Sequence, residues 1–252
     1  MISVILLGAG NVATHLYKAF AASNNVTVNQ WYNRTLDTIE SYKNDVEIIN
    51  NLSQLTEADV YILAVSDDAI SELSSQLPFE NRFVVHTSGS VSAYDIDKKN
   101  RRGVFYPLQT FSKSTSVNFS EIPICIETLV RTDYSLLKSV AISISDHTKR
   151  VNSDQRASLH LAAVFVNNFT NQIYRVAHEI TESNGAEFDM LKPLILETAK
   201  KVQDISPYKA QTGPAKRNDK KTIKKHLKAL DNAHHKANYN LLTESIKKTH
   251  GR

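Results

Sequence analysis

The sequence predicts an α/β protein in two parts, a mostly parallel, doubly wound sheet followed by an all-helical segment. Two observations predict this fold class. In the N-terminal half, short apolar runs alternate with helical patterns, which is typical of β-α-β units. After about residue 153 the apolar runs give way to long stretches with helical spacing. We therefore expect one domain over residues 1–152 and a second over residues 153–252.

The first domain is expected to alternate strands and helices in chain order. Its apolar runs predict strands at 2–7, 26–32, 46–49, 60–65, 83–87, 104–106 and 122–126, with a last one at 148–152. Helical patterns fall between them at 11–23, 35–43, 67–77 and 133–144.

The second domain opens with one long predicted helix over 156–183, which Asn184-Gly185 is well suited to end in a left-handed conformation. A helix over 188–204 holds Pro193 either near its start or at a kink. A loop over 206–218 leads to helices at 219–231 and about 235–249. Within the long helix, residues 161–166 are apolar all round, so we expect them to be buried.

Composition places the chain among intracellular proteins. The single cysteine, Cys125, excludes an internal disulfide and favours a reducing compartment. The N-terminus reads as a strand rather than a signal peptide, and no apolar stretch is long enough to cross a bilayer. We therefore expect a cytoplasmic protein with no membrane partner.

The C-terminal residues are strongly basic, with 12 Lys or Arg against 3 Asp or Glu over 209–252. Such a segment can attract nucleic acid. Here Ile223, Leu227 and Leu230 form an apolar stripe at helical spacing, and the lysines fall on the opposite face. This favours an ordinary solvated helix over nucleic-acid binding, which steep salt dependence of binding to DNA or RNA would instead support.

A glycine-rich turn directly follows the first predicted strand and precedes a helix. It has the G-x-G-x-x-A form, in which the first glycine permits a tight turn and the second lets a pyrophosphate approach. The small last residue lets the helix pack close to the strand. An ordinary glycine turn is the alternative, but the position favours a Rossmann-type dinucleotide site, with the cofactor held by Gly8, Gly10, Asn11, Val12 and Ala13.

The end of the second predicted strand bears on the choice of cofactor. A site specific for NAD usually places a carboxylate there, whereas this sequence has Asn33, Arg34 and Thr35, with no acid before Asp37. Donors and a cation suit the 2′-phosphate of NADP(H). The alternative is that Arg34 is merely a surface residue at a helix start.

Two further loops follow predicted strands at the edge where such sheets bind ligands. Val65, Ser66 and Asp67 follow one strand and His86 ends the next, so all four are candidates to line the cofactor. Helix capping is the alternative for Ser66 and Asp67. His86 has the alternative of being a hydrogen-bonded polar residue at the sheet edge.

Polar residues on one face of the long helix are the candidates for catalysis. Arg156, His160, Asn167 and Asn171 share this face and interrupt an apolar run. We expect His160 to be the proton donor, since histidine exchanges protons near neutral pH, and Asn167 to orient the substrate. Alternatively, these side chains satisfy one another or a neighbouring helix across a dimer interface.

Substrate contacts are expected from Gln109, Asn171 and the loop residues Thr212, Gly213 and Arg217, which could hold a carboxylate or phosphate. A Gly-Pro turn beside a helix start needs no ligand, however. We expect no metal site, because His234 and His235 point to different sides of a helix and no Cys or acidic cluster supports them.

These segments together resemble a known family. Asn-Arg-Thr at 33–35, Ala-Val-Ser-Asp-Asp at 64–68, His-Thr-Ser-Gly-Ser at 86–90, Phe-Tyr-Pro-Leu-Gln-Thr-Phe at 105–111 and the segments 162–171 and 211–219 are similar to bacterial Rossmann-like NADP oxidoreductases. Members carry a C-terminal helical domain of unknown function, DUF2520. The wider relatives are pyrroline-5-carboxylate reductases and the 6-phosphogluconate and β-hydroxyacid dehydrogenases. The sequence lacks a clear Lys-x-x-Asn pair on a helix, of the kind that the β-hydroxyacid dehydrogenases use, which puts their proton-donor assignment in doubt here.

The resemblance implies an NADP(H)-dependent oxidoreductase that moves a hydride to or from a small carbonyl or imine in a cleft between the domains, as a homodimer. The alternative is a non-catalytic NADP(H)-binding redox sensor or scaffold whose helical part recruits a partner.

Overall fold

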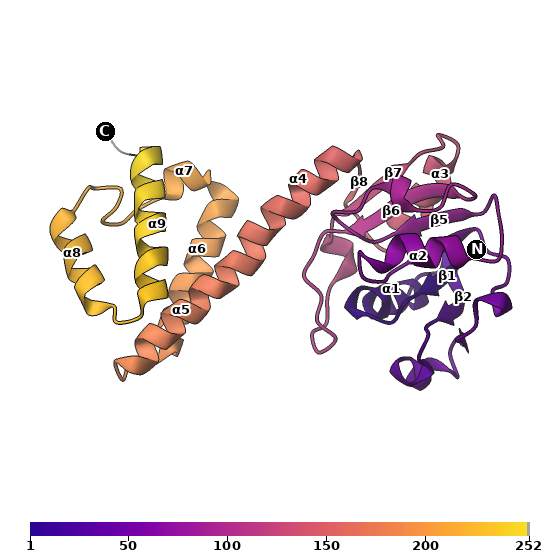
Figure 1. Cartoon of the computed structure of the whole chain (residues 1–252), viewed down its shortest axis with the longest axis horizontal. Coiled ribbons are helices and arrows are strands. Elements are labelled where there is room, and N and C mark those ends of the chain that lie inside the picture. Colours follow the sequence, from indigo (N-terminus) through magenta and orange to yellow (C-terminus); the bar gives the residue numbers. More distant parts are fainter. Residues whose placement is uncertain (251–252) are drawn as a thin grey trace. The chain divides into compact units, whose positions relative to one another are not determined.

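The computed structural model describes residues 1–250, and over them the first part of the chain forms an eight-stranded sheet (Figure 1). The strand order is β3-β2-β1-β4-β5-β6-β7-β8. Neighbours from β3 to β6 are parallel, β7 is antiparallel to β6, and β8 is parallel to β7. The strands are β1 Ile2–Leu7, β2 Val26–Tyr32, β3 Glu47–Ile49, β4 Val60–Leu63, β5 Phe83–His86, β6 Arg101–Pro107, β7 Ile124–Thr128 and β8 Thr148–Arg150.

Helices cover both faces of this sheet, as the doubly wound fold class requires. Helices α1 (Asn11–Ala21) and α3 (Asp133–Ile142) contribute to one apolar cluster, which holds Val4 and Leu6 of β1. Helix α2 (Ala69–Gln76) contributes to the other, with Ile5 and Leu7. Alternate residues of β1 therefore face opposite layers, and all four are fully buried.

The predicted helix over 35–43 is wrong. The chain forms two short 3-10 turns there, Leu36–Thr38 and Glu40–Tyr42. The apolar residues of this stretch, Leu36, Ile39 and Tyr42, recur every third position, which matches the three residues per turn of a 3-10 helix. Burial of Ile39 anchors the pair of turns.

The strand predicted at 122–126 lies two residues later. Residues Phe119–Glu121 form a 3-10 turn, and Pro123 has no N–H to donate to a ladder. The strand therefore begins at Ile124 and continues to Thr128, which pairs with Gly103 of β6.

The long helix begins at residue 153 and is not a single α-helix. Asn152 caps α4 (Ser153–Ala163) in a capping box with Gln155. A π-helical segment, Val164–Phe169, separates α4 from α5 (Thr170–Ser183). Gly185 follows with a φ of +67°, so the predicted left-handed stop is confirmed.

The prediction that residues 161–166 are buried is wrong for the single chain. Leu161 is 61 % exposed and Val166 is 76 % exposed. A run that is apolar all round can equally lie on a helix whose covering surface is not part of the same chain.

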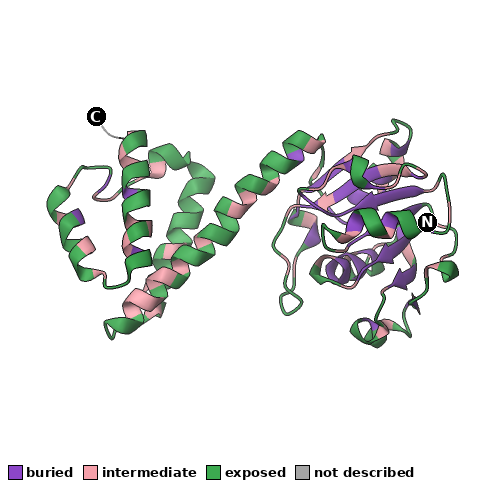
Figure 2. Cartoon of the chain, in the orientation of Figure 1, coloured by how far each residue is buried: buried purple, intermediate pink, exposed green. Residues whose placement is uncertain are grey.

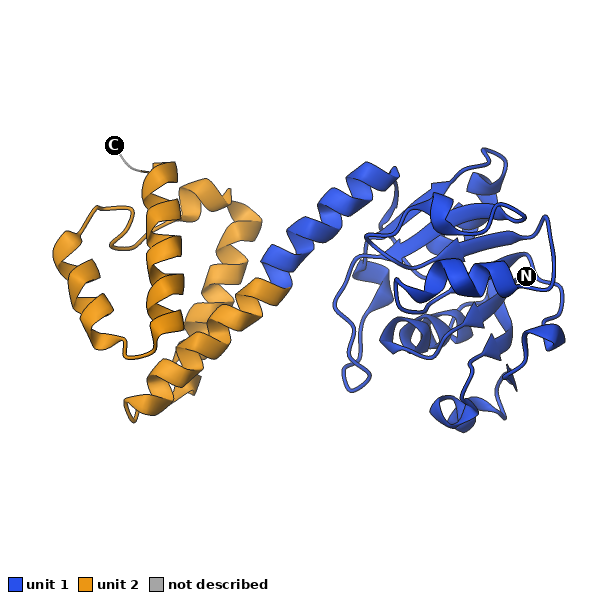
Figure 3. Cartoon of the chain, viewed as in Figure 1, with its two compact units in different colours: residues 1–167 blue, residues 168–252 orange. Residues whose placement is uncertain are grey.

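Contacts divide the chain into two compact units, Met1–Asn167 and Asn168–Arg252 (Figure 3). The change from α/β to all-α structure comes earlier, where α4 begins. The second unit continues with α6 (Lys192–Asp204), α7 (Pro207–Ala210), α8 (Lys220–Ala229) and α9 (Ala233–His250). Pro193 lies in the first turn of α6, so it starts the helix rather than kinking it.

The two units differ in how much apolar surface they bury (Figure 2). Nearly all buried apolar side chains belong to the sheet and its helices. Among the described residues from 168 to 250, Ala215 and Ile223 are the only buried hydrophobic ones. None of the helices within residues 1–250 combines the length and apolar character that crossing a membrane requires.

Candidate dinucleotide site and proton-transfer pair

A cavity of about 510 Å³ lies at the carboxyl ends of β1, β2 and β4. The glycine turn, the end of β2, the residues after β4 and one face of α2 line it. In open parallel sheets, ligands bind at this edge, where the strand order reverses beside β1. The cavity therefore lies where the sequence predicts the cofactor.

Each glycine of the turn has its own role. Gly8 has a φ of +114°, and a Cβ there would lie 2.3 Å from the Ala64 carbonyl oxygen, so the protein itself demands glycine. Gly10 has open space where its Cβ would be. Because no protein atom requires glycine at position 10, its absent side chain leaves room for a ligand at the start of α1, which suits a pyrophosphate.

The other residues of the turn hold the strand and helix together. Ala13 is fully buried against the sheet, while Asn11 and Val12 line the cavity. Trp31 of β2 donates its indole N–H to the Gly8 carbonyl oxygen at 2.6 Å and stacks on Tyr17 of α1. The turn is therefore fixed by a buried hydrogen bond as well as by its glycine.

The loop after β2 carries the cation Arg34 and is held by hydrogen bonds of its neighbour Asn33. Arg34 is exposed and lines the cavity with Asn33. The Asn33 amide donates to the Thr35 carbonyl oxygen at 2.7 Å and to the Thr38 hydroxyl at 2.9 Å. Thr38 lines the cavity. The Thr35 carbonyl oxygen accepts hydrogen bonds from the Asn33 amide and the Thr38 hydroxyl. Glu72 is the one acidic side chain among the described residues lining this cavity.

The loops after β4 and β5 are joined to each other. Val65 and Ser66 line the cavity, and Asp67 accepts a hydrogen bond from the Ser90 hydroxyl. His86 is fully buried, with its two ring nitrogens at the Ser88 N–H (3.1 Å) and the Ser92 carbonyl oxygen (3.3 Å). Burial, with Arg156 adding to the effect, lowers the pKa of His86 to about 4, so it is neutral. The buried His86 ring therefore holds the backbone of the loop after β5 at Ser88 and Ser92.

His160 lies against the loop after β5. Nδ1 of His160 is 3.2 Å from the hydroxyl of Tyr106 on β6, and the rings meet edge to face. A Cβ on Gly89 would lie 2.6 Å from His160 Nδ1 and 2.8 Å from the Tyr106 ring. The glycine of the His-Thr-Ser-Gly-Ser segment thus allows both rings to reach the loop that follows β5.

The sequence pattern after β6 favoured Gln109 as the polar contact, whereas the structure places Tyr106 at His160. The Gln109 side chain is exposed and accepts the Thr110 N–H at 2.8 Å. Burial, with Cys125 adding to the effect, raises the pKa of Tyr106 to about 12, so the phenol keeps its proton at neutral pH. The sequence signal that could have found Tyr106 is its position next to the carboxyl end of β6, directly before Pro107.

The polar face of the long helix separates into two groups. Arg156 is 1 % exposed, pairs with Glu127 of β7 and donates to the Val91 carbonyl oxygen. Asn167 and Asn171 are exposed. Asn171, Thr212, Gly213 and Arg217 belong to the second unit, and their substrate role stays a prediction. Across residues 1–250, no group of three or more His, Cys, Asp or Glu side chains could hold a metal ion.

The fold and the glycine turn define a dinucleotide-binding protein of Rossmann type. Residues 3–89 match the family model described as NADP oxidoreductase, coenzyme F420-dependent, and residues 122–246 match a domain of unknown function, DUF2520. A proposed NADP oxidoreductase from Bacteroides fragilis is 38 % identical, with 98 % of each chain covered and a TM-score of 0.88. The chain belongs to the same family as this protein, which confirms the resemblance, and NADP is the cofactor that the family description names.

More distant structures share the fold. An imine reductase from Streptomyces aurantiacus is 15 % identical, with 98 % of this chain and 95 % of that chain covered and a TM-score of 0.74. Pyrroline carboxylate reductase of Plasmodium falciparum, solved with NADP bound, is 12 % identical, with 100 % and 98 % covered and a TM-score of 0.62. No curated protein matches the sequence.

Proposed function

We propose that the protein is an NADP(H)-dependent oxidoreductase that transfers a hydride to or from a small carbonyl or imine compound. The observation that carries this proposal is the cavity beside the glycine turn, with open space at Gly10 and Arg34 on its wall. The cavity, the turn and the family all favour the same cofactor.

Arg34 is the basis for choosing NADP(H) over NAD(H). A guanidinium at the end of β2 can form charge-assisted hydrogen bonds with a 2′-phosphate. A carboxylate at this place would instead hold a 2′-hydroxyl and repel the phosphate. Asn33 and Thr38 brace the loop that carries Arg34, so the cation is presented on a defined backbone.

The reduction also needs a proton, for which the Tyr106–His160 pair is the candidate. NADPH supplies a hydride when bound, and the oxygen or nitrogen of the substrate must take up a proton. We assign that proton to His160. Tyr106 fixes one ring nitrogen of His160 at 3.2 Å, which leaves Nε2 to face a substrate. Gln109, Asn167 and Asn171 remain candidates for holding this substrate, together with Thr212, Gly213 and Arg217.

The active form in this proposal is a homodimer. The second unit buries almost no apolar side chain, while Leu194 is 62 % exposed and Leu241 is 72 % exposed. Large exposed apolar surfaces mark protein contacts.

Sedimentation of the wild-type chain should give twice the monomer mass, and Leu161→Glu, on the exposed run of α4, should shift it towards monomer. A wild-type monomer at micromolar concentration would contradict this part.

The experiment that tests the proposal is a titration of the purified protein with NADPH and, separately, with NADH, followed by nicotinamide fluorescence. Arg34→Ala should weaken NADPH binding about 10- to 100-fold, since a hydrogen bond to a charged group contributes about 1.5–3 kcal/mol. NADH affinity should change much less. The matched control is Arg131→Ala, which removes an exposed arginine that does not line the cavity.

Two outcomes would contradict the proposal at different levels. Equal losses for NADPH and NADH in Arg34→Ala would remove Arg34 from cofactor selection. Absence of binding of either dinucleotide to the wild-type protein would refute the proposed function as a whole.

A further inference from the structure

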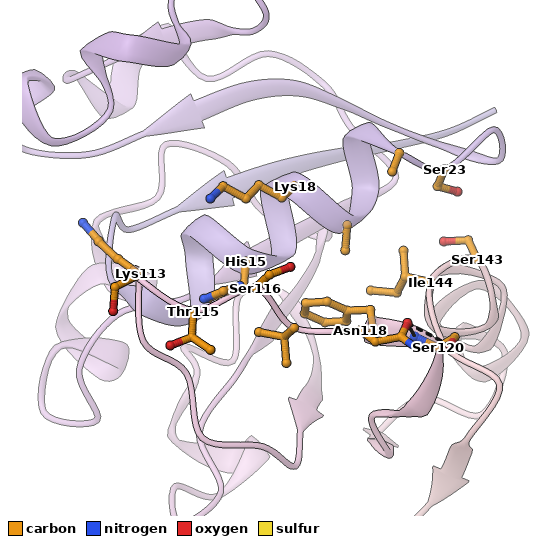
Figure 4. A pocket seen from close by; sticks show the side chains of 15 residues that line it. His15, Lys18, Ser23, Lys113, Thr115, Ser116, Asn118, Ser120, Ser143 and Ile144 are labelled. Carbon is orange, nitrogen blue, oxygen red and sulfur yellow. Dashed lines mark hydrogen bonds between the residues drawn. The ribbon is translucent and has the colours of Figure 1, made fainter.

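A second cavity, of about 520 Å³, opens beside α1 at residues outside the glycine turn (Figure 4). One wall is a single face of the helix, formed by His15, Lys18, Ala19 and Ala22. The other wall is the segment 113–120, which follows β6. The cavity shares no lining residue with the dinucleotide cavity.

The two ends of this second cavity differ in chemistry. Lys18 and Lys113 lie at one end in Figure 4, and Ser143 and Ile144 at the other. Phe119 and Ile144, both buried, add apolar surface. Five serines and a threonine also line the cavity, at Ser23, Ser114, Thr115, Ser116, Ser120 and Ser143.

The charge of the lining is one-sided. Among the described residues that line the cavity, two are lysines and none is acidic. Glu121, just beyond the lining, accepts a hydrogen bond from the Asn118 amide at 3.1 Å, which helps to hold the segment. The cavity therefore offers two cations at one end, apolar surface at Phe119 and Ile144, and hydroxyl groups along its lining.

The two residues just before this segment, Phe111 and Ser112, are tied to the start of α1. The Asn11 side chain donates to the Phe111 carbonyl oxygen at 2.9 Å. Nε2 of His15 lies 2.9 Å from the Ser112 carbonyl oxygen, so it carries the hydrogen, and its ring packs on Phe111. Asn11 lines the dinucleotide cavity and His15 lines the second one. The backbone at 111–112 thus contacts one lining residue of each cavity.

We propose that the second cavity binds a small organic anion, a phosphate monoester or a carboxylate with an apolar body, and that this binding strengthens NADPH binding. The anionic group meets Lys18 and Lys113, and the apolar body lies towards Phe119 and Ile144. A ligand that orders the segment 113–120 also fixes the neighbouring carbonyls that hold Asn11 and His15. By linkage, NADPH strengthens anion binding by the same factor.

The test is calorimetric titration of the full chain, saturated with NADPH, with phenyl phosphate and with benzoate. Saturation keeps the probes out of the dinucleotide site. Benzyl alcohol, which has the ring without the charge, and inorganic phosphate, which has the charge without the ring, should both bind more weakly. If phenyl phosphate alone binds, the ligand class is a phosphate monoester; if benzoate binds as well, it includes carboxylates.

Two kinds of variant locate the binding. Lys18→Gln with Lys113→Gln should weaken phenyl phosphate about tenfold, whereas Lys98→Gln with Lys138→Gln, exposed lysines outside the cavity, should leave it within about twofold. Ala22→Phe fills the cavity, keeps both lysines and should abolish binding. Equal affinity in the wild type and the Lys18/Lys113 variant, or in Ala22→Phe, would overturn the site.

The coupling is measured by repeating the NADPH titration with and without phenyl phosphate. We expect the wild type to bind NADPH at least about fivefold more tightly with the probe, the lower end of typical coupling between sites, and Ala22→Phe to show no difference. An unchanged NADPH affinity in the wild type would overturn the coupling. If the protein does not bind NADPH at all, the proposed function fails, yet the anion titration of the unliganded chain against Ala22→Phe still decides the site.

Discussion

Replacing Arg156 by methionine removes the one charged side chain of α4 that enters the core of the first unit. The Arg156 side chain is 1 % exposed and forms an ion pair with Glu127, which is 12 % exposed. It also donates to the Val91 carbonyl oxygen, and Ser153 donates to Glu127 at 3.0 Å. Methionine has a similar length and no charge, so Arg156→Met tests the ion pair rather than the packing.

The expected loss follows from what stays behind. Without Arg156, Glu127 keeps only the Ser153 hydroxyl as a partner among the described residues, and its carboxylate is largely buried. Removing one partner of a buried pair costs about 3–5 kcal/mol, because an uncompensated charge is left away from water. At about 2–4 °C per kcal/mol for a unit of this size, the melting temperature should fall by roughly 10 °C.

Urea unfolding followed by Trp31 fluorescence is the appropriate assay, because this single tryptophan is buried in the same unit. Arg82→Met is the matched control, since it removes an arginine from the exposed pair with Glu57 and should cost at most about 1 kcal/mol. Arg156→Met combined with Glu127→Gln should recover part of the loss by removing the orphaned charge. A loss in Arg156→Met no larger than in Arg82→Met would refute the reasoning.

Three further predictions concern single residues of the first unit. Gly8→Ala should abolish NADPH binding in the fluorescence titration, because its Cβ would lie 2.3 Å from a carbonyl oxygen, whereas Gly213→Ala, also at positive φ but facing open space, should bind normally; equal binding would contradict this. His86 has a folded pKa of about 4, below its ordinary 6.5, so the free energy of unfolding should fall by up to about 3 kcal/mol as pH drops through this window, because only the unfolded state gains the proton. His86→Gln should lose that slope in urea unfolding, and an unchanged slope would assign it to other groups. Tyr106→Phe removes the contact with His160 and should cost about 1 kcal/mol of stability with NADPH affinity unchanged; a large loss of NADPH affinity would place the phenol in the cofactor site instead.

The fold and the cofactor turn were predictable because their signals are local. A strand, a glycine turn and a helix follow one another within twenty residues, and each glycine has a steric reason that the sequence spacing conveys. The class change near residue 153 was equally visible, since hydrophobic periodicity shifts there from strands to helices.

The failures arose where tertiary context decides. Apolar residues at 36, 39 and 42 can also be accommodated on one face of an α-helix, whereas the structure forms two 3-10 turns that bury Ile39. Burial of residues 161–166 was inferred because their side chains are apolar all round the helix. Such a pattern does not tell whether the surface that covers it belongs to the same chain. The Tyr106–His160 contact joins residues 54 apart in sequence, so no local sequence pattern could predict it.

The long-range contacts also explain how one helix can position His160, the proposed proton donor. Arg156 and His160 are four residues apart on α4, so their side chains share a face. Because Arg156 is locked to β7 and to the Val91 carbonyl, the next turn of the helix is directed at the loop after β5. There, Gly89 leaves room for the His160 ring and Tyr106 fixes its Nδ1. The buried Arg156–Glu127 ion pair therefore orients α4, and with it His160, in addition to stabilising the core. It follows that Arg156→Met should loosen His160, and that Glu127→Gln, which keeps a hydrogen-bond acceptor for Arg156, should loosen it less.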